Sequence, residues 1–276
     1  MRRFLTFAVL PLSVAGLVVG LGVQSATAGN SRSWREQGFT TQIRGVDMSL
    51  WQHGGATEPN FVKMRAAGVQ FVFIKSSDGL RRGDISAAKW WSIDRPAAHA
   101  AGLVVGSYHF AQPTTAKSNA KIIADAKAGA RLAASRTGQF KSGYLPTALD
   151  LESAPASITK ARLTLWTTTW LGTFKQLTGR KPFLYSYGYF LSHRLNPTAT
   201  LTSYPLWLAE YRKGSTQPQH VLGWPVVPVI WQFTSSGKVS GSGSSAIDLN
   251  VFYGSKAQLR IMAKISKAKA ARYGLN

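Results

Sequence analysis

The sequence predicts a single-domain, irregular β/α barrel of the TIM-like type, an α/β fold with a groove at the C-terminal ends of its strands. Eight short apolar segments recur along the chain, and several are nearly continuous in hydrophobic residues, as are strands buried on both faces of a parallel sheet. Stretches with helical periodicity separate some of these segments. Strand, helix and strand repeated over roughly 210 residues is typical of a β/α barrel.

The eight predicted strands follow one another from residue 43 to residue 252. In order they are IRGVDM (43–48), VQFVFIK (69–75), LVVGSYHF (103–110), YLPTALDLE (144–152), PFLYSY (182–187), YPLWLA (204–209), VVPVIWQF (226–233) and AIDLNVF (246–252).

Two long segments have the periodicity of helices. Residues 115–135 are rich in Ala and Lys, and residues 157–178 place an apolar row opposite a face of Thr and Lys. Gly179 is the predicted stop of the second helix. The spacing of this row is helical, which favours core packing over a ligand-binding surface. Its members are Leu163, Trp166, Trp170, Phe174 and Leu177. Later connections are too short for full helices, so we expect an irregular closure of the barrel.

The N-terminal residues have the layout of a secretory signal peptide. Two arginines precede an apolar stretch that ends near Val23, and a small-residue site predicts cleavage after Ala28. An uncleaved membrane anchor is the alternative, because the apolar run approaches spanning length. Residues 29–42 are then a loose polar arm, residues 43–254 the barrel, and residues 255–276 a basic C-terminal helix or tail. We expect a protein that is secreted, either extracellular or associated with a cell wall.

Composition narrows the function classes. A chain of 276 residues can bury a sizeable core without disulfides, and the absence of cysteine excludes thiol catalysis and Cys-based zinc sites. The net charge is +22; cleavage after Ala28 leaves 31 Lys and Arg against 11 Asp and Glu, or +20. Such a charge attracts polyanions, which for an exported protein include anionic cell-wall polymers as well as nucleic acid.

Two carboxylates stand close together in the segment YLPTALDLES. On a strand, residues i and i+2 face the same side, so Asp150 and Glu152 share a face while Leu149 and Leu151 face the other way. If the leucines pack under helices, the carboxylates point into the barrel near its C-terminal end, where barrel active sites lie. Neighbouring carboxylates raise each other's pKa, so that one can remain protonated as an acid. A solvated loop is the alternative.

Further acidic, aromatic and amide residues lie at predicted strand ends. Asp47 and Asp248 add two carboxylates there, and the other candidates suit sugar rings and N-acetyl groups. These are Tyr108, Tyr187, Trp207, Trp231 and Gln232. Each aromatic residue taken alone is more typical of a core. His109 has no partner at metal-ligand spacing, so we predict no metal site there.

Six segments, in order and spacing, together resemble the motifs of glycoside hydrolase family 25, the N-acetylmuramidase lysozymes. They are RGVDMSLWQ, GVQFVFIKSSDG, GLVVGSYHFAQP, LPTALDLE, PLWLAEY and VIWQFTSSGKVSG…AIDLNVF, and the resemblance covers about residues 43–253. It implies an irregular β/α barrel that hydrolyses the β-1,4 bond from N-acetylmuramic acid to N-acetylglucosamine in peptidoglycan. It implies no cofactor, and we expect a monomer with no specific nucleic-acid partner and no membrane contact after signal cleavage.

The resemblance also implies residue roles. By motif position Glu152 matches the general acid and Asp150 its partner carboxylate, acting as nucleophile or as stabiliser of a substrate-derived intermediate. Asp47, Asp248 and Tyr108 match groups that line the catalytic groove. The chain departs from the pattern at Asp78, where the family usually has Glu, and this leaves the role of Asp78 open.

Three other functions compete with a muramidase. A wall-binding module that has lost catalysis is consistent with the change at Asp78, although the Asp150 and Glu152 pair is intact. A secreted nucleic-acid binder is consistent with the charge, but carboxylates in the groove would repel phosphates there. A different barrel glycosidase such as a chitinase has a related acid motif, yet DLNVF and YHF fit the muramidase pattern better.

Overall fold

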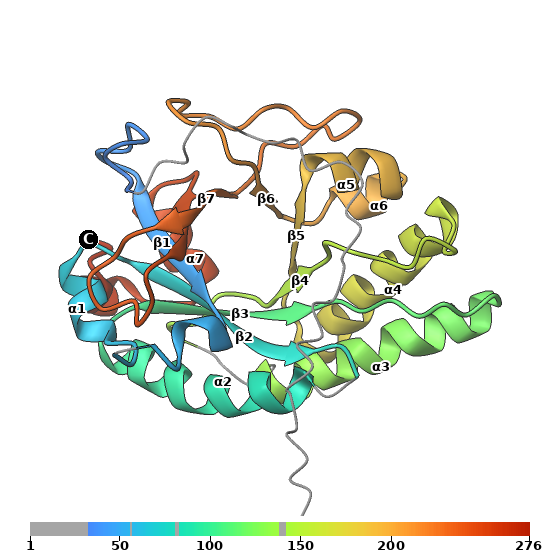
Figure 1. The fold of residues 1–276 in the computed structure, drawn as a ribbon, viewed down its shortest axis with the longest axis horizontal. Helices are drawn as coiled ribbons and strands as arrows, with labels where there is room; N and C mark the ends of the chain where they lie inside the picture. The colour runs from blue at the N-terminus through green and yellow to red at the C-terminus, as the bar shows by residue number, and fades with distance from the viewer. Residues whose placement is uncertain (1–32, 56, 81–82, 138–141) are drawn as a thin grey trace, which may run out of the picture.

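A computed structural model describes residues 33–55, 57–80, 83–137 and 142–276 of the chain. The predicted signal peptide, residues 1–28, lies outside the described residues. The eight predicted strands form one closed barrel in which neighbours follow chain order from β1 to β8 (Figure 1). The predicted TIM-like fold is therefore confirmed.

The strands agree with the predicted segments, with shifts at their ends. They are β1 (Ile43–Met48), β2 (Phe71–Asp78), β3 (Val104–Phe110), β4 (Ala148–Asp150), β5 (Phe183–Tyr187), β6 (Leu206–Ala209), β7 (Ile230–Gly237) and β8 (Ile247–Phe252).

The barrel closes irregularly at β8. Strands β1 to β7 pair in parallel, whereas β8 runs antiparallel to both β7 and β1. The loop between β7 and β8 is rich in Gly and Ser and too short for a crossover helix, so the chain can only return antiparallel. Gly241 and Gly243 take positive φ there, 88° and 81°, which favours glycine. As a result the first residues of β8 lie beside the carboxyl end of β1.

The long helices cover one side of the barrel (Figure 1). They are α2 (Gly83–Ala100), α3 (Asn119–Thr137) and α4 (Lys160–Thr178), and the shorter ones are α1 (Phe61–Ala66), α5 (Gly188–Arg194), α6 (Ala199–Thr202) and α7 (Lys256–Met262). Two 3₁₀ helices, η1 and η2, span Leu50–Gln52 and Lys267–Tyr273. Within the described ranges, no helix combines the length and apolar character needed to cross a membrane.

Local sequence explains where α4 begins and ends. The side chain of Thr159 caps the helix by accepting a hydrogen bond from the backbone of Arg162, and Gly179 ends it in the left-handed conformation, as predicted. The sequence analysis did not identify α2, because its buried face combines alanines with Trp91 and Asp94 and therefore lacks an apolar period.

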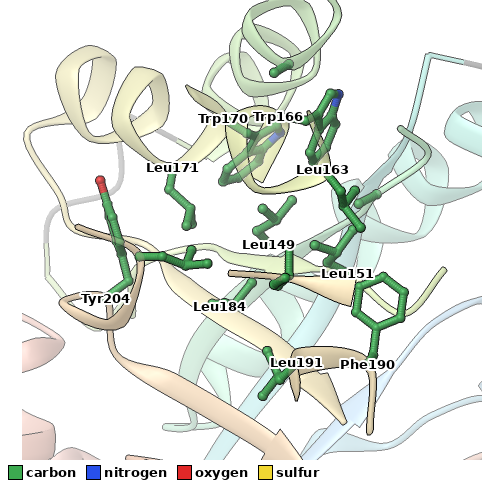
Figure 2. Packing of buried hydrophobic residues seen from close by; sticks show 14 of the residues in the cluster. Leu149, Leu151, Leu163, Trp166, Trp170, Leu171, Leu184, Phe190, Leu191 and Tyr204 are labelled. Carbon is green, nitrogen blue, oxygen red and sulfur yellow. The ribbon is translucent and has the colours of Figure 1, made fainter. Parts of the chain in front are cut away.

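The core has an outer and an inner part. Outside the barrel, Leu149 of β4 and Leu151, which directly follows the strand, pack beneath Trp166 and Trp170 of α4 (Figure 2). This confirms the core interpretation of the tryptophans. Inside the barrel, an aromatic cluster around Phe73 fills the space between the amino ends of the strands.

Both chain ends of the described domain pack against the barrel. In the arm, Phe39 is fully buried against Trp231 and Phe233, so residues 33–42 are not loose as expected. The C-terminal residues Leu259, Tyr273 and Leu275 are buried in the same cluster as the strand residues of the barrel interior. This segment therefore closes the amino-terminal end of the barrel, which we call the floor, and the opposite end stays open as the mouth.

Candidate active site

A cavity of about 240 Å³ opens at the mouth of the barrel, formed by residues at the carboxyl ends of β1 to β7 and by the first residues of β8. Seven of the predicted site residues line it: Asp47, Tyr108, Asp150, Glu152, Trp207, Gln232 and Asp248. Six further residues that the sequence analysis did not select line it too: Ser49, Trp51, Lys75, Phe110, Tyr185 and Tyr211.

Strand β4 points Asp150 and Glu152 into this cavity. Leu149 and Leu151 are buried in the outer core, as the alternation of a strand requires, so the two carboxyls face inward. Asp150 is only 6% exposed, whereas Glu152, just beyond the end of the strand, is half-buried. The two groups therefore share one side of the cavity but differ in their access to water.

Burial and neighbouring charges affect the pKa values of the two carboxyls differently. Burial, and then the neighbouring Glu152, raise the pKa of Asp150 well above its ordinary value. Burial also raises the pKa of Glu152, but a hydrogen bond from Asp150 and the charge of Lys75 act in the opposite direction. In the free protein the proton of the pair therefore resides mainly on Asp150, which donates it to Glu152.

Asp47 and Asp248 form a second pair on the other side of the cavity. They are opposite one another in the antiparallel register of β1 and β8. Asp47 Oδ2 accepts hydrogen bonds from Gln232 Nε2 at 2.9 Å and from Asn250 Nδ2 at 2.7 Å. Burial raises the pKa of Asp47 to about 6, and burial together with the charge of Asp47 raises the pKa of Asp248 to about 9. At neutral pH Asp47 is charged and Asp248 is neutral.

Replacing Asp248 by Asn is expected to flatten the pH dependence of stability. The folded protein keeps this carboxyl protonated up to about pH 9, while the unfolded chain ionises it near pH 3.8. Its favourable contribution is complete below the lower value and is lost as pH rises toward the higher one. Asn stays neutral, so the variant should lose less stability across this range, on the order of 1–3 kcal/mol less because the side chain is partly exposed. Urea denaturation at several pH values measures the difference, and identical pH slopes would contradict the assignment.

Asp78 does not line the cavity but holds a residue that does. Its Oδ2 accepts a hydrogen bond from Lys75 Nζ at 2.5 Å and its Oδ1 one from Gln112 Nε2 at 2.6 Å. Lys75 lines the cavity and its ammonium lies 4.5 Å from the centre of the Phe110 ring. Asp78 therefore affects the site indirectly, by holding the side chain of Lys75.

We expect Asp78→Asn to lower kcat by about 10-fold, because an amide holds the Lys75 ammonium less firmly than a charged carboxylate does. Since Lys75 lowers the pKa of Asp150 and Glu152, the pH profile should also change shape. Asp78→Glu, which restores the charge, should recover most of the rate. A pH profile identical to that of the unmutated protein would show that Asp78 does not act through Lys75.

Comparison with known proteins identifies the chain. The model of Glycosyl hydrolases family 25 matches residues 46–242. The chain belongs to this family. A lysozyme from Streptomyces coelicolor has the same fold, with a TM-score of 0.69 and 27% identity over 82% of this chain and 98% of that one.

Two curated relatives of this family 25 hydrolase carry names that describe an activity. Lysozyme M1 of Streptomyces globisporus is 28% identical over 234 residues, which cover 81% of this chain and 72% of that protein. The N,O-diacetylmuramidase of Chalaropsis sp. is 29% identical over 213 residues, which cover 73% of this chain and 92% of that protein.

Aromatic side chains form much of the wall of the cavity in this family 25 hydrolase. Trp207 donates from Nε1 to Asn250 Oδ1 at 2.8 Å and packs against Tyr185, with ring centres 4.6 Å apart. The hydroxyls of Tyr185 and Tyr211 both donate to Gln232 Oε1, at 3.0 and 2.8 Å. Gln232 accepts from these rings and donates to Asp47, which fixes its amide at the mouth.

The structure does not bring Trp231, which the sequence analysis expects to bind substrate, to the cavity. Trp231 is fully buried between Phe39 and Phe233 and donates from Nε1 to the backbone oxygen of Glu210 at 2.7 Å. Its strand neighbour Gln232 lines the cavity, and alternation along β7 turns the preceding residue outward.

Tyr187 and His109 lie outside the cavity lining as well. Tyr187 is 37% exposed at the end of β5, and burial, followed by the charge of Glu152, raises the pKa of its hydroxyl. His109 Nδ1 is 2.8 Å from Ser77 Oγ, and burial lowers the pKa of the imidazole to about 3. His109 is thus a neutral, hydrogen-bonded core residue. In the described part of the chain no group of His, Asp or Glu side chains is arranged to hold a metal ion.

Simple signals could have found some of the missed residues. Lys75 is a charged residue directly after the apolar run FVFI of β2, Phe110 is the last residue of β3, and Tyr211 follows the end of β6 by two residues. Trp51, 77% exposed in η1, has no such signal because a loop positions it.

Proposed function

We propose that the protein is a secreted N-acetylmuramidase that hydrolyses the β-1,4 bond from N-acetylmuramic acid to N-acetylglucosamine in peptidoglycan. The observation that carries this is the carboxyl pair on β4, which shares a proton at the wall of a cavity lined by aromatic and amide groups. Membership of family 25 and the names of the lysozyme and diacetylmuramidase relatives support the substrate class.

In the proposed mechanism Glu152 donates the proton and Asp150 supplies the compensating charge. As the bond between C1 of the muramic acid and the leaving oxygen breaks, the proton held by Asp150 passes to Glu152, and Glu152 delivers it to that oxygen. Asp150 thus becomes negative as positive charge develops at C1. Water then attacks C1, and its proton returns through Glu152 to Asp150.

The spacing of the pair favours retention of configuration at C1. Asp150 ends β4 and Glu152 follows two residues later, and the hydrogen bond between their carboxyls holds them closer than the roughly 6.5–9.5 Å that an inverting enzyme needs for its water. Asp150 then either attacks C1 directly or stabilises a ring formed by the 2-acetamido group of the substrate. One oxygen of Asp150, Oδ1, has no hydrogen-bond partner within the described residues, and this spare acceptor is consistent with a role toward the N–H of that group.

We also propose that the protein is exported and is held at the cell wall. The predicted signal peptide supports export, and the net charge of +20 after cleavage supports retention on an anionic wall. We propose that the mature chain acts as a monomer without a cofactor. Asp47 and Asp248, with Tyr108, Trp207 and Gln232, would bind the sugar rings on either side of the cleaved bond.

Chemical analysis of the new sugar ends tests the proposal. Purified peptidoglycan is digested with the mature protein, the products are reduced with borohydride, and the reduced termini are identified by mass spectrometry. Reduced muramic acid is the expected terminus, and reduced glucosamine would identify a different glycosidase. No new ends, from a protein that still sediments with the walls, would identify a binding module on the scaffold of an enzyme.

A further inference from the structure

The acidic residues of this protein are unevenly distributed over its elements. All eleven lie within the described residues, at the carboxyl ends of β1, β2, β4 and β6, at the start of β8, between β1 and α1, in α2 and α3, and in the arm. None lies in the connections that lead from a helix to the next strand, or after Asp248. The described parts of those connections and the C-terminal segment lie at the floor of the barrel, and they contribute no Asp or Glu side chain.

The same floor carries a concentration of cations. The C-terminal segment contributes six Lys and Arg residues, and the α4–β5 connection adds Arg180 and Lys181. Lys181, Lys264, Lys267 and Lys269 are exposed. These positive charges also act on His99. Burial lowers the pKa of its imidazole, and the charges of Arg272 and Arg95 lower it further.

A groove of about 400 Å³ crosses this floor. Arg180, Lys181 and Lys264 line it together with apolar surface from Pro146, Ile261 and Met262. Arg180 is buried and donates from Nη2 to the backbone oxygens of Tyr144 and Met262, at 2.7 and 2.8 Å, which ties the C-terminal segment to the barrel. The groove is therefore a fixed part of the fold.

Lys264 stands at a position that glycine ordinarily occupies. Its φ is +54°, in the left-handed region, and the backbone of Ile265 donates to Arg260 to complete the end of α7. A lysine at this strained position presents its ammonium to the groove, whereas glycine would close the helix without a charge.

We propose that this floor groove binds a linear polyphosphodiester of the cell wall, of the polyol-phosphate type. Single phosphates separated by short carbon units match a groove that combines cations with apolar surface. The groove lining includes no aromatic ring on which bases could stack, which disfavours single-stranded nucleic acid. Because the floor and the mouth are opposite ends of the barrel, polymer bound at the floor leaves the mouth free to take the glycan. The choice of a wall polymer rests on the proposed function.

Two triple variants of equal charge test this proposal. The floor variant carries Lys181→Gln, Lys264→Asn and Lys267→Gln; Asn is used at 264 because it tolerates the left-handed conformation. The mouth-side control carries Lys117→Gln, Lys213→Gln and Lys238→Gln, three exposed lysines in connections at the carboxyl ends of the strands. Thermal denaturation confirms that both fold.

Binding to purified poly(glycerol phosphate) is measured at low and moderate salt, with duplex DNA as the comparison ligand. The floor variant should bind the polymer at least 10-fold more weakly and with a smaller salt dependence, while the control changes less than about 3-fold. Equal losses in both variants would mean that net charge alone acts. If the unmutated protein bound DNA as tightly as the polymer, and the floor variant lost both affinities to the same extent, the floor would be an unselective surface for polyanions. Either result overturns the proposal.

A second readout separates this proposal from the proposed function. On soluble, polymer-free peptidoglycan fragments both variants should release reducing ends at the rate of the unmutated protein. On polymer-bearing walls at low salt the floor variant alone should be slower, and removal of the polymer from the walls should abolish the difference. Polymer binding without cleavage of any substrate would refute the muramidase and leave the floor site standing.

Discussion

Replacing Glu152 by Gln is expected to lower kcat on peptidoglycan by about 10²–10⁴-fold, with little change in wall binding. Gln keeps the shape of the side chain and can still hydrogen-bond to Asp150, but it cannot donate a proton to the leaving oxygen. The half-buried position of Glu152 at the cavity wall makes it the group of the pair that a substrate can reach. Release of reducing ends per enzyme per minute measures the effect.

The control for this variant is Glu210→Gln. Glu210 also follows a strand, β6, but its carboxylate accepts from the backbone of Gln219 at 2.5 Å and does not line the cavity. This change should leave the rate within about 3-fold of the unmutated protein. Substantial residual activity in Glu152→Gln would move the role of the acid to another residue.

Asp150→Asn should cost about as much in kcat, by roughly 10²–10³-fold, for a different reason. The amide keeps the neutral shape that Asp150 has in the free protein, so folding and ground-state binding should persist. It cannot become negative as charge develops at C1, and it cannot return a proton to Glu152. The loss should therefore be in kcat, with KM nearly unchanged.

The pH profile of the Asp150→Asn variant distinguishes a catalytic role of Asp150 from a purely structural one. In the unmutated protein the alkaline limb reports loss of the proton that the pair shares. In the variant Glu152 titrates alone, and Lys75 with the amide hydrogen bond lowers its pKa, so the limb should move to lower pH. An unmoved alkaline limb would mean that Asp150 only packs the site.

The sequence predicted the barrel well because its strands are short, apolar and buried on both faces. Each of the eight predicted segments overlaps an observed strand, although β2 and β7 extend beyond the predicted ends. It could not predict that β8 runs antiparallel, since direction depends on what closes the sheet and not on the segment itself. Helix α2 was missed because Asp94 lies on its buried face, where it is bonded to His53 at 2.8 Å. A pairing of this kind across 41 residues leaves no local periodicity.

The site was predicted where a strand alone fixes side-chain direction. Alternation along the β4 segment was enough to place Asp150 and Glu152 on the same side. The same rule would have placed Trp231 outside the barrel if it had been known that Gln232 faces inward. The part played by Asp78 depends on where Lys75 and Gln112 lie, and these come from β2 and from the segment after β3. Residues from different elements meet only once the barrel is closed.

The anomeric configuration of the first product tests the central claim most directly, namely that one carboxyl pair on one strand cleaves the bond to muramic acid. A soluble peptidoglycan oligosaccharide is digested with the mature protein, and proton NMR follows the new reducing end before it mutarotates. The account predicts that the β anomer of N-acetylmuramic acid appears first and decays toward equilibrium. First appearance of the α anomer, or of an N-acetylglucosamine end, would contradict it.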